Sequence, residues 1–293
     1  MNIMEKKFII GVGSQRAGSS FLWRLLGLHP QIKMHPVKEL HYFDTLYGIR
    51  PEEKLRVFSK KSLALEIDKL CQTKEFGFIN PDWQCHLKTH FHFFTTPIEK
   101  INYLDLFSGL GEDEGVKFLG ESTPEYMLLQ DAQISRMREL VGDARIVLMC
   151  RNPIKRTISA FRLRLGGGED EVLPEERERF FLSLLTGNRL WIRTQREFGN
   201  YKLAFEKYSK CFSNVLLLPY DDIIDNPSGM LENLSRFLDL AFDEKHLKPA
   251  FKTMFNASEV EYSPGPEAMA RLDGLFTDQL KEVEDLLGST LKY

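Results

Sequence analysis

The sequence predicts an α/β fold of three layers, in which a central parallel sheet of about five strands lies between two layers of helices. Short apolar segments rich in β-branched residues recur along the chain, and helical patterns separate most of them. Unbroken apolar segments of this kind are typical of parallel strands that are covered on both faces. The 293 residues show no internal repeat and no linker, so we expect a single domain over residues 1–293.

Five segments are predicted to be strands. Lys6–Gly11 is short, apolar and closed by a glycine, and Arg145–Cys150 holds an unbroken apolar run. The other three are Gln31–Met34, Val116–Leu119 and Asn214–Leu218. Sheets of this type bind ligands beyond the carboxyl ends of their strands, where we therefore expect the functional residues.

Amphipathic patterns predict the helices. Gly18–Leu28 places its large apolar side chains along one face, and Ala268–Leu287 has the pattern of one long amphipathic helix. The other predicted helices cover residues 51–70, 132–140, 153–165, 174–185, 200–208 and 227–238. Residues 71–115 are rich in aromatic residues and histidine and show no clear period, which predicts an insertion that packs over the sheet.

Composition excludes several classes of protein. The 42 acidic and 39 basic residues give a net charge of −3, which offers no general electrostatic attraction to nucleic acid or to an anionic membrane. No apolar stretch is long enough to span a bilayer, and the one near the amino terminus is too short for a signal peptide. The four cysteines are scattered without a Cys-x-x-Cys pair, which favours reduced thiols and a cytoplasmic protein.

A glycine-rich loop joins the first predicted strand to the first predicted helix. Gly13 and Gly18 fit the glycines of the phosphate-binding pattern G-x-x-x-x-G-K-S/T, which makes the fold P-loop-like, but Ser19 stands at the place of the lysine. Backbone N–H groups and a helix N-terminus at such a loop attract a phosphate. The candidate binding residues are Gln15, Arg16, Ala17, Gly18, Ser19 and Ser20. A glycine-rich turn that binds nothing is the alternative.

Two further segments carry candidate residues. Glu39 and His41 follow the second predicted strand and point the same way in an extended segment, so either could act as a general base, although a surface Lys–Glu pair is the alternative. Arg151 ends the fourth predicted strand, and Ser159 lies two turns into the next helix. The arginine is placed to make a forked contact with a phosphate, unless this helix is only rich in surface arginine, as Arg156 would indicate.

Together these features resemble the family of sulfotransferases that use 3′-phosphoadenosine-5′-phosphosulfate (PAPS), especially its heparan-sulfate and bacterial branches. The resemblance assigns the first loop to the 5′-phosphosulfate, with Arg16 at the usual place of a lysine. It makes Glu39 the base of the pattern K-E-x-x-x-F, with His41 beside it, and it gives the 3′-phosphate to Arg151 and Ser159.

Other segments extend the resemblance along the chain. Glu121–Tyr126 resembles the pattern E-x-S/T-P-x-Y near the acceptor, but Ser122 replaces the lysine typical of heparan enzymes, which argues against a polyanionic acceptor. Residues 199–201, 216–222 and 272–293 also resemble family segments, although Tyr293 stands where a tryptophan is expected. The acidic, glycine-rich stretch 166–171 favours a lid and a neutral or cationic acceptor, with a solvated loop as the alternative.

The resemblance implies transfer of the sulfuryl group of PAPS to a hydroxyl or amine of a small-molecule or carbohydrate acceptor, with 3′,5′-ADP as the product. Residues 71–115 would shape the acceptor pocket, or else form ordinary core. No metal is predicted: His86, His90 and His92 lack a paired carboxylate and a clear helical period. A homo-oligomer is compatible with the sequence. A small-metabolite kinase with a P-loop-like fold and a non-catalytic nucleotide-binding module are the competing functions.

Overall fold

The computed structural model describes residues 6–73, 80–112, 114–166, 172–243, 248–251 and 260–291. Five strands form one sheet in the order β2-β3-β1-β4-β5. They are β1 (Lys7–Gly13), β2 (Ile32–Met34), β3 (Phe118–Ser122), β4 (Arg145–Cys150) and β5 (Val215–Pro219). Both β1 and β2 pair with β3 in parallel. The predicted α/β fold with a central parallel sheet is confirmed.

The strand predictions agree best where the strand is wholly apolar. β4 begins and ends where it was predicted, whereas β3 begins two residues later than expected and continues to Ser122. The polar residues Glu121 and Ser122 hid this end, although both are buried. Gly11 of β1 lies opposite Ser122, and a Cβ atom at Gly11 would stand 2.4 Å from Ser122 Oγ, so the two strands require glycine there.

The chain divides into two compact units, and each is built from three segments. The first unit holds Met1–Val12, Leu22–Val147 and Lys207–Val215, and the second holds Gly13–Phe21, Leu148–Glu206 and Leu216–Tyr293. The helices of the first unit include α2 (Tyr42–Leu46), α3 (Glu52–Thr73), α4 (Pro81–Thr95) and α5 (Asp131–Val141), and α1 (Ser19–Gly27) and α9 (Tyr201–Cys211) contribute to both units. None of the described helices is both long enough and apolar enough to cross a membrane.

An aromatic cluster forms the core beside β1 in the first unit. The ring of Phe8 meets that of Phe107 edge-on at 5.2 Å, and Phe43 lies 4.7 Å from Tyr103 and 5.4 Å from Tyr126. Tyr103 and Phe107 belong to the short 3-10 helix η3 (Tyr103–Phe107), so this helix packs against Phe8 of β1.

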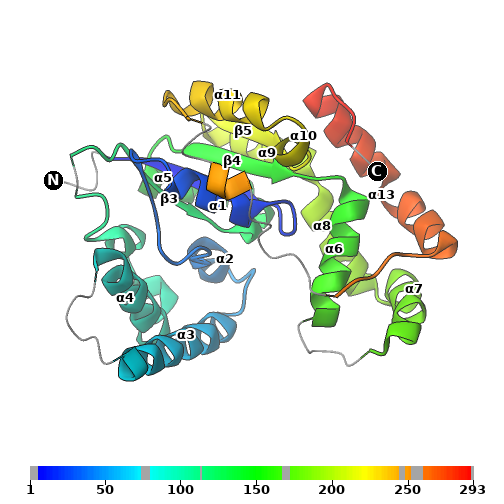
Figure 1. The fold of residues 1–293 in the computed structure, drawn as a ribbon, viewed down its shortest axis with the longest axis horizontal. Coiled ribbons are helices and arrows are strands. Elements are labelled where there is room, and N and C mark those ends of the chain that lie inside the picture. The colour runs from blue at the N-terminus through cyan, green and yellow to red at the C-terminus, as the bar shows by residue number, and fades with distance from the viewer. Residues whose placement is uncertain are drawn as a thin grey trace. The chain divides into compact units, whose positions relative to one another are not determined.

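The rest of that segment was not expected to be helical. α4 runs alongside α3 (Figure 1). Asn80 caps the first turn of α4, because its Oδ1 accepts a hydrogen bond from the Trp83 backbone N–H group. The buried face of α4 consists of Cys85, Thr89, His90 and Phe93. These residues have a helical spacing, but only Phe93 is a large apolar residue. A search for apolar periodicity therefore misses it. The predicted segment also includes residues 74–79 and 113, which lie outside the described residues.

The second unit is mainly helical. Its helices include α6 (Pro153–Gly166), η5 (Pro174–Glu176), α7 (Arg177–Gly187), α8 (Arg189–Gly199), α10 (Asp222–Asp225), α11 (Pro227–Leu238) and α13 (Pro266–Leu287). Phe161, Phe181 and Phe276 join its core, where α6, α7 and α13 pack together. α8 was not predicted, because its buried positions include Gln195 and Gly199 among several arginines. The predicted lid falls largely on residues 167–171, outside the described part of the chain.

Candidate functional site

The glycine-rich loop belongs to the second unit, where hydrogen bonds hold it in place. The Ser14 N–H group donates to the Met149 carbonyl oxygen (2.9 Å), and Ser14 Oγ donates to the Phe198 carbonyl oxygen (2.7 Å). Gly18 has a φ of 95°, and a Cβ atom there would lie 2.9 Å from Tyr220 Cδ2. The turn therefore requires glycine at this position, both for its backbone angle and for space.

The other predicted loop residues differ in what they can offer a ligand. Gln15, Arg16 and Ser20 are partly exposed, whereas Ala17 and Ser19 are buried. The Ala17 N–H group already donates to the Ser14 carbonyl oxygen (3.1 Å), so it stabilises the loop itself. Ser19 begins α1, where the positive end of the helix favours an anion.

Three predicted residues meet within the second unit. Arg16 Nε donates to Ser159 Oγ at 3.0 Å, and Arg151 Nη1 donates to the Arg16 carbonyl oxygen, also at 3.0 Å. Arg16 has a left-handed φ of 66°, which brings a long side chain out of a tight turn at some cost in backbone strain. The loop and α6, more than a hundred residues apart in sequence, thus contribute to one cationic cluster, which we define as Arg16, Arg151 and Ser159.

The charges in this cluster are poorly solvated. Burial lowers the pKa of the Arg16 guanidinium, and the neighbouring charge of Arg151 lowers it further. Burial also lowers the pKa of Arg151, whose guanidinium lies 4.3 Å from the ring centre of Tyr220 and whose Nε finds no hydrogen-bond partner among the described residues. Two adjacent, partly buried cations are stabilised by an anion, which makes this cluster suited to a phosphate or sulfate group.

Arg156 is a residue of the second unit whose position the sequence did not reveal. The alternative interpretation, a helix rich in surface arginine, is wrong for Arg156, whose side chain is fully buried. Arg156 Nη2 donates to the Gln195 carbonyl oxygen (2.8 Å) and to Gln195 Oε1 (3.0 Å), while its Nε and Nη1 have no partner among the described residues. Burial lowers its pKa to about 10. No sequence pattern distinguishes this residue from the other arginines of α6.

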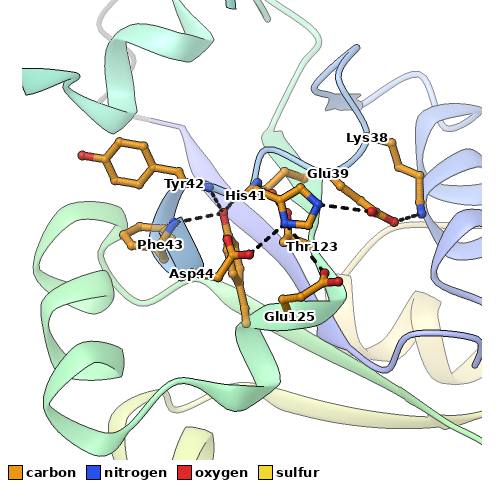
Figure 2. A network of polar contacts seen from close by, with 10 residues as sticks. Lys38, Glu39, His41, Tyr42, Phe43, Asp44, Thr123 and Glu125 are labelled. Atoms are coloured by element: carbon orange, nitrogen blue, oxygen red, sulfur yellow. Dashed lines mark hydrogen bonds and ion pairs between the residues drawn. The ribbon is translucent and has the colours of Figure 1, made fainter. Parts of the chain in front are cut away.

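The first unit holds the other predicted residues. His41 precedes α2 with a left-handed φ of 51°, and its imidazole lies between carboxylates (Figure 2). Its Nδ1 donates to Asp44 Oδ2 at 2.8 Å and lies 3.8 Å from Glu125 Oε2, while Nε2 lies 3.5 Å from Glu39 Oε2. Lys38 Nζ pairs with Glu39 Oε1. We call Lys38, Glu39, His41, Asp44 and Glu125 the acidic network.

The acidic network fixes the charges of its members. Burial by itself would raise the pKa of Glu39, but the hydrogen bond from His41 and the pairing with Lys38 outweigh burial and lower it to about 2. Burial would lower the pKa of His41, but Asp44, Glu39 and Glu125 raise it to about 10. At neutral pH Glu39 is therefore a carboxylate and His41 an imidazolium.

Glu39, His41 and Glu125 also satisfy a geometric test for a metal site, because each offers one ligand atom and these atoms lie within 4.8 Å of one another. A metal requires a neutral imidazole, whereas His41 keeps its proton well above neutral pH. Metal binding at this group would therefore have to displace the proton that His41 carries at neutral pH.

A second buried carboxylate, Glu121, supports the acidic network from β3. Tyr103 Oη and Tyr126 Oη each donate to Glu121 Oε1 at 2.9 Å, and Thr123 Oγ1 donates to Oε2 at 2.6 Å. The His41 N–H group donates to Thr123 Oγ1 (3.4 Å), so these bonds hold the start of α2 against the end of β3. Glu121 lies in the segment that the sequence marked for its resemblance, which was the signal that could have found it.

An open hollow of about 380 Å³ lies elsewhere, along α8 and α13 of the second unit. Arg189, Arg193, Arg196 and Gln279 are among its lining residues, and no predicted site residue lines it. The cationic cluster and the acidic network, where several predicted residues meet, are therefore the candidate sites.

Comparison with known proteins gives the family. A protein-family model described as Sulfotransferase family matches residues 8–244, a range that contains all the predicted site residues. A solved sulfotransferase from Alicyclobacillus acidocaldarius has a similar fold, with a TM-score of 0.59 at 20% identity, covering 98% of this chain and 97% of that one.

Two further solved structures share the fold. The sulfotransferase domain of the Synechococcus PCC 7002 olefin synthase has a TM-score of 0.50 at 16% identity, covering 96% of this chain and 94% of that one. The sulfotransferase domain from the curacin biosynthetic pathway has a TM-score of 0.52 at 14% identity, covering 98% and 99%. No protein with a curated description matches the sequence. Because the family model spans most of the chain, we conclude that the protein belongs to the sulfotransferase family.

Proposed function

We propose that this protein transfers the sulfuryl group of PAPS to a hydroxyl or amine of a small-molecule or carbohydrate acceptor and releases 3′,5′-ADP. The observation that carries the proposal is the cationic cluster, in which Arg16 and Arg151 lie together although 135 residues separate them. A donor with phosphate at both ends of its adenosine needs two anion sites. Ser19 in place of the lysine argues against ATP chemistry at the first of them.

The residues of the second unit fit such a donor. When bound, PAPS supplies a sulfuryl group attached to a 5′-phosphate leaving group. The loop Gln15–Ser20 would hold the 5′-phosphosulfate with main-chain N–H groups and the start of α1. Arg151 and Ser159 would hold the 3′-phosphate, and Arg16 would stabilise the negative charge that develops on the leaving oxygen. Fixed positive charges supply this stabilisation, so the proposal needs no metal.

Glu39 would act as the general base. As the acceptor oxygen attacks sulfur, its O–H bond breaks and the proton moves to Glu39, while the sulfur–oxygen bond to the 5′-phosphate breaks and leaves its electron pair on the phosphate. A carboxylate whose pKa is about 2 is a weak base, so proton transfer must accompany bond formation, when the hydroxyl becomes acidic. His41 already carries two protons at neutral pH, which favours Glu39 over His41 for this role.

The acceptor and the cellular compartment are parts of the same proposal. The acidic network offers no unpaired positive charge for a polyanion, and Ser122 contributes none, so we propose a neutral or cationic acceptor. Cys71, Cys85, Cys150 and Cys211 are free thiols, which supports our expectation of a reducing, cytoplasmic environment.

Labelled PAPS with a panel of alcohols, sugars and amines tests the proposal, together with thermal shifts in 3′,5′-ADP and in ATP with magnesium. We expect 3′,5′-ADP to stabilise the protein and label to move to an acceptor. Stabilisation only by ATP with magnesium would favour a kinase, and binding of 3′,5′-ADP without turnover on the panel would favour a non-catalytic module.

The role of Glu39 has its own test. Glu39→Gln should lower kcat by about 10²–10⁴-fold, the usual cost of losing a general base, across the pH range in which the protein is folded. His41→Ala is the matched comparison, since it removes the rival base. A Glu39→Gln variant that kept most of its activity would show that another group takes the proton.

A further inference from the structure

Glu125 lies in the short 3-10 helix η4 (Pro124–Leu128), and its carboxylate lies near His41 Nδ1, whereas that of Glu39 lies near His41 Nε2 (Figure 2). We propose that Glu125 is a positioning residue for acceptor deprotonation: acting through His41, its carboxylate sets how strongly Glu39 attracts the proton. The proposal rests on the proposed function, and it assigns a role to a residue that carries none in the mechanism above.

Geometry indicates that Glu125 acts through His41 and not on the acceptor. Its Oε2 lies 3.8 Å from His41 Nδ1, is shielded from solvent and has no hydrogen-bond partner among the described residues. The Glu125 side chain is 15% exposed, against 33% for Glu39. Of the two carboxylates, Glu39 is therefore the one that an acceptor can reach more readily.

The charge balance of the acidic network explains the effect. Before transfer, the positive Lys38 and His41 face the negative Glu39 and Asp44. When Glu39 takes the proton, the network becomes one unit more positive. An ionised Glu125 stabilises that state, whereas a neutral Glu125 does not. Proton transfer to Glu39 is thus more favourable when Glu125 carries its charge.

Glu125 can change its charge near neutral pH. Burial raises its pKa to about 7, with Glu39 and Asp44 also raising it and His41 lowering it. Among the described residues, the charged groups that act most strongly on Glu125 are these three, while Lys38 acts on Glu39, and Asp44 acts on Glu121 of β3. As pH rises through about 7, Glu125 ionises and Glu39 becomes a stronger base.

The kinetic test compares Glu125→Gln with the unmodified protein. We expect kcat of the unmodified protein to rise about tenfold between about pH 6 and about pH 8, a modest share of a general-base effect. Glu125→Gln should stay near the low-pH rate throughout, with little change in the KM for PAPS. Glu125→Asp, which keeps the charge on a shorter side chain, should recover part of the rise. Glu139→Gln, in an exposed pair on α5, is the matched control.

A second measurement does not depend on turnover. The imidazole of His41 is titrated by NMR, with its signals assigned by their loss in His41→Gln. Loss of the Glu125 charge should lower the pKa of His41 in Glu125→Gln, whereas Glu139→Gln should leave it unchanged.

The outcomes separate this proposal from the proposed function. An unchanged His41 titration in Glu125→Gln would overturn the coupling, whatever the activity. A lowered His41 pKa with an unaltered pH–rate profile would overturn the catalytic role. Full activity of Glu39→Gln would instead refute the general base of the proposed function, while the NMR titration would still report whether Glu125 and His41 are coupled.

Discussion

The carboxylate of Glu121 should make the stability of this protein depend on pH in an unusual direction. Its side chain is fully buried, and burial raises its pKa from 4.5 to about 7, despite the hydrogen bonds from Thr123, Tyr126 and Tyr103 that favour the ionised form. The unfolded chain therefore loses this proton at lower pH than the folded protein does. Between about pH 4.5 and 7 the folded state binds more protons at this residue, so its contribution to the free energy of unfolding falls as pH rises.

The magnitude follows from the two pKa values. The difference between 4.5 and about 7, at about 1.36 kcal/mol for each pH unit, corresponds to about 3 kcal/mol. Glu121→Gln removes the titration. The free energy of unfolding of the variant minus that of the unmodified protein should therefore increase with pH by about 3 kcal/mol across this window and then level off. Toward the low-pH end of the window Glu121 becomes protonated in both the folded and the unfolded state. The difference in free energy of unfolding measured there reports mainly the effect of the amide on the hydrogen bonds.

Urea unfolding of both proteins at half-unit steps from about pH 4.5 to about pH 8 measures this difference, in which the other titrating groups largely cancel. Glu139→Gln, whose side chain is 61% exposed, is the control and should show no such slope. A difference that stayed flat, or that fell as pH rose, would mean that the three hydroxyl groups outweigh burial, and the reasoning would be refuted.

Two further predictions concern the second unit. Arg151→Met should weaken binding of 3′,5′-ADP by about 10–100-fold, the loss expected for a charged hydrogen bond, and leave AMP binding nearly unchanged. Calorimetry measures both affinities, with the exposed Arg193→Met as the control. Equal losses for both nucleotides would contradict a contact between Arg151 and the 3′-phosphate. Phe161→Ala should lower the free energy of unfolding by about 3–5 kcal/mol in denaturant titrations, because the ring is fully buried 4.4 Å from that of Phe181; a loss below about 1 kcal/mol would contradict this packing.

The sequence predicted the sheet better than the helices. β4 is wholly apolar apart from its first residue, so its composition alone predicts that it is buried. The buried faces of α4 and α8 carry Thr89, His90 and Gln195, whose burial depends on partners in other elements. The hydrogen bond between His90 Nδ1 and Ser59 Oγ is an example, since the residues next to His90 in sequence do not predict a partner 31 residues away.

The same distinction applies to the candidate site. Arg16 and Arg151 could be marked because each occupies a strand-to-helix junction, a local pattern that predicts anion binding. Arg156 and Glu121 could not be understood in this way. Their burial depends on Gln195 and Tyr103, which lie in segments that local patterns did not connect to them.

The left-handed backbone at Arg16 and His41 has a consequence for engineering. The only other residue with such an angle, glycines apart, in the described part of the chain is Asp239, at the end of α11. Glycine would relieve about 1 kcal/mol of strain at either position. At His41 glycine would also remove the cation that pairs with the buried Asp44 and with Glu39, which costs more than the strain relieved. A laboratory selection for heat resistance alone should therefore favour replacement of Arg16, and variants gained that way should trade turnover for thermal tolerance.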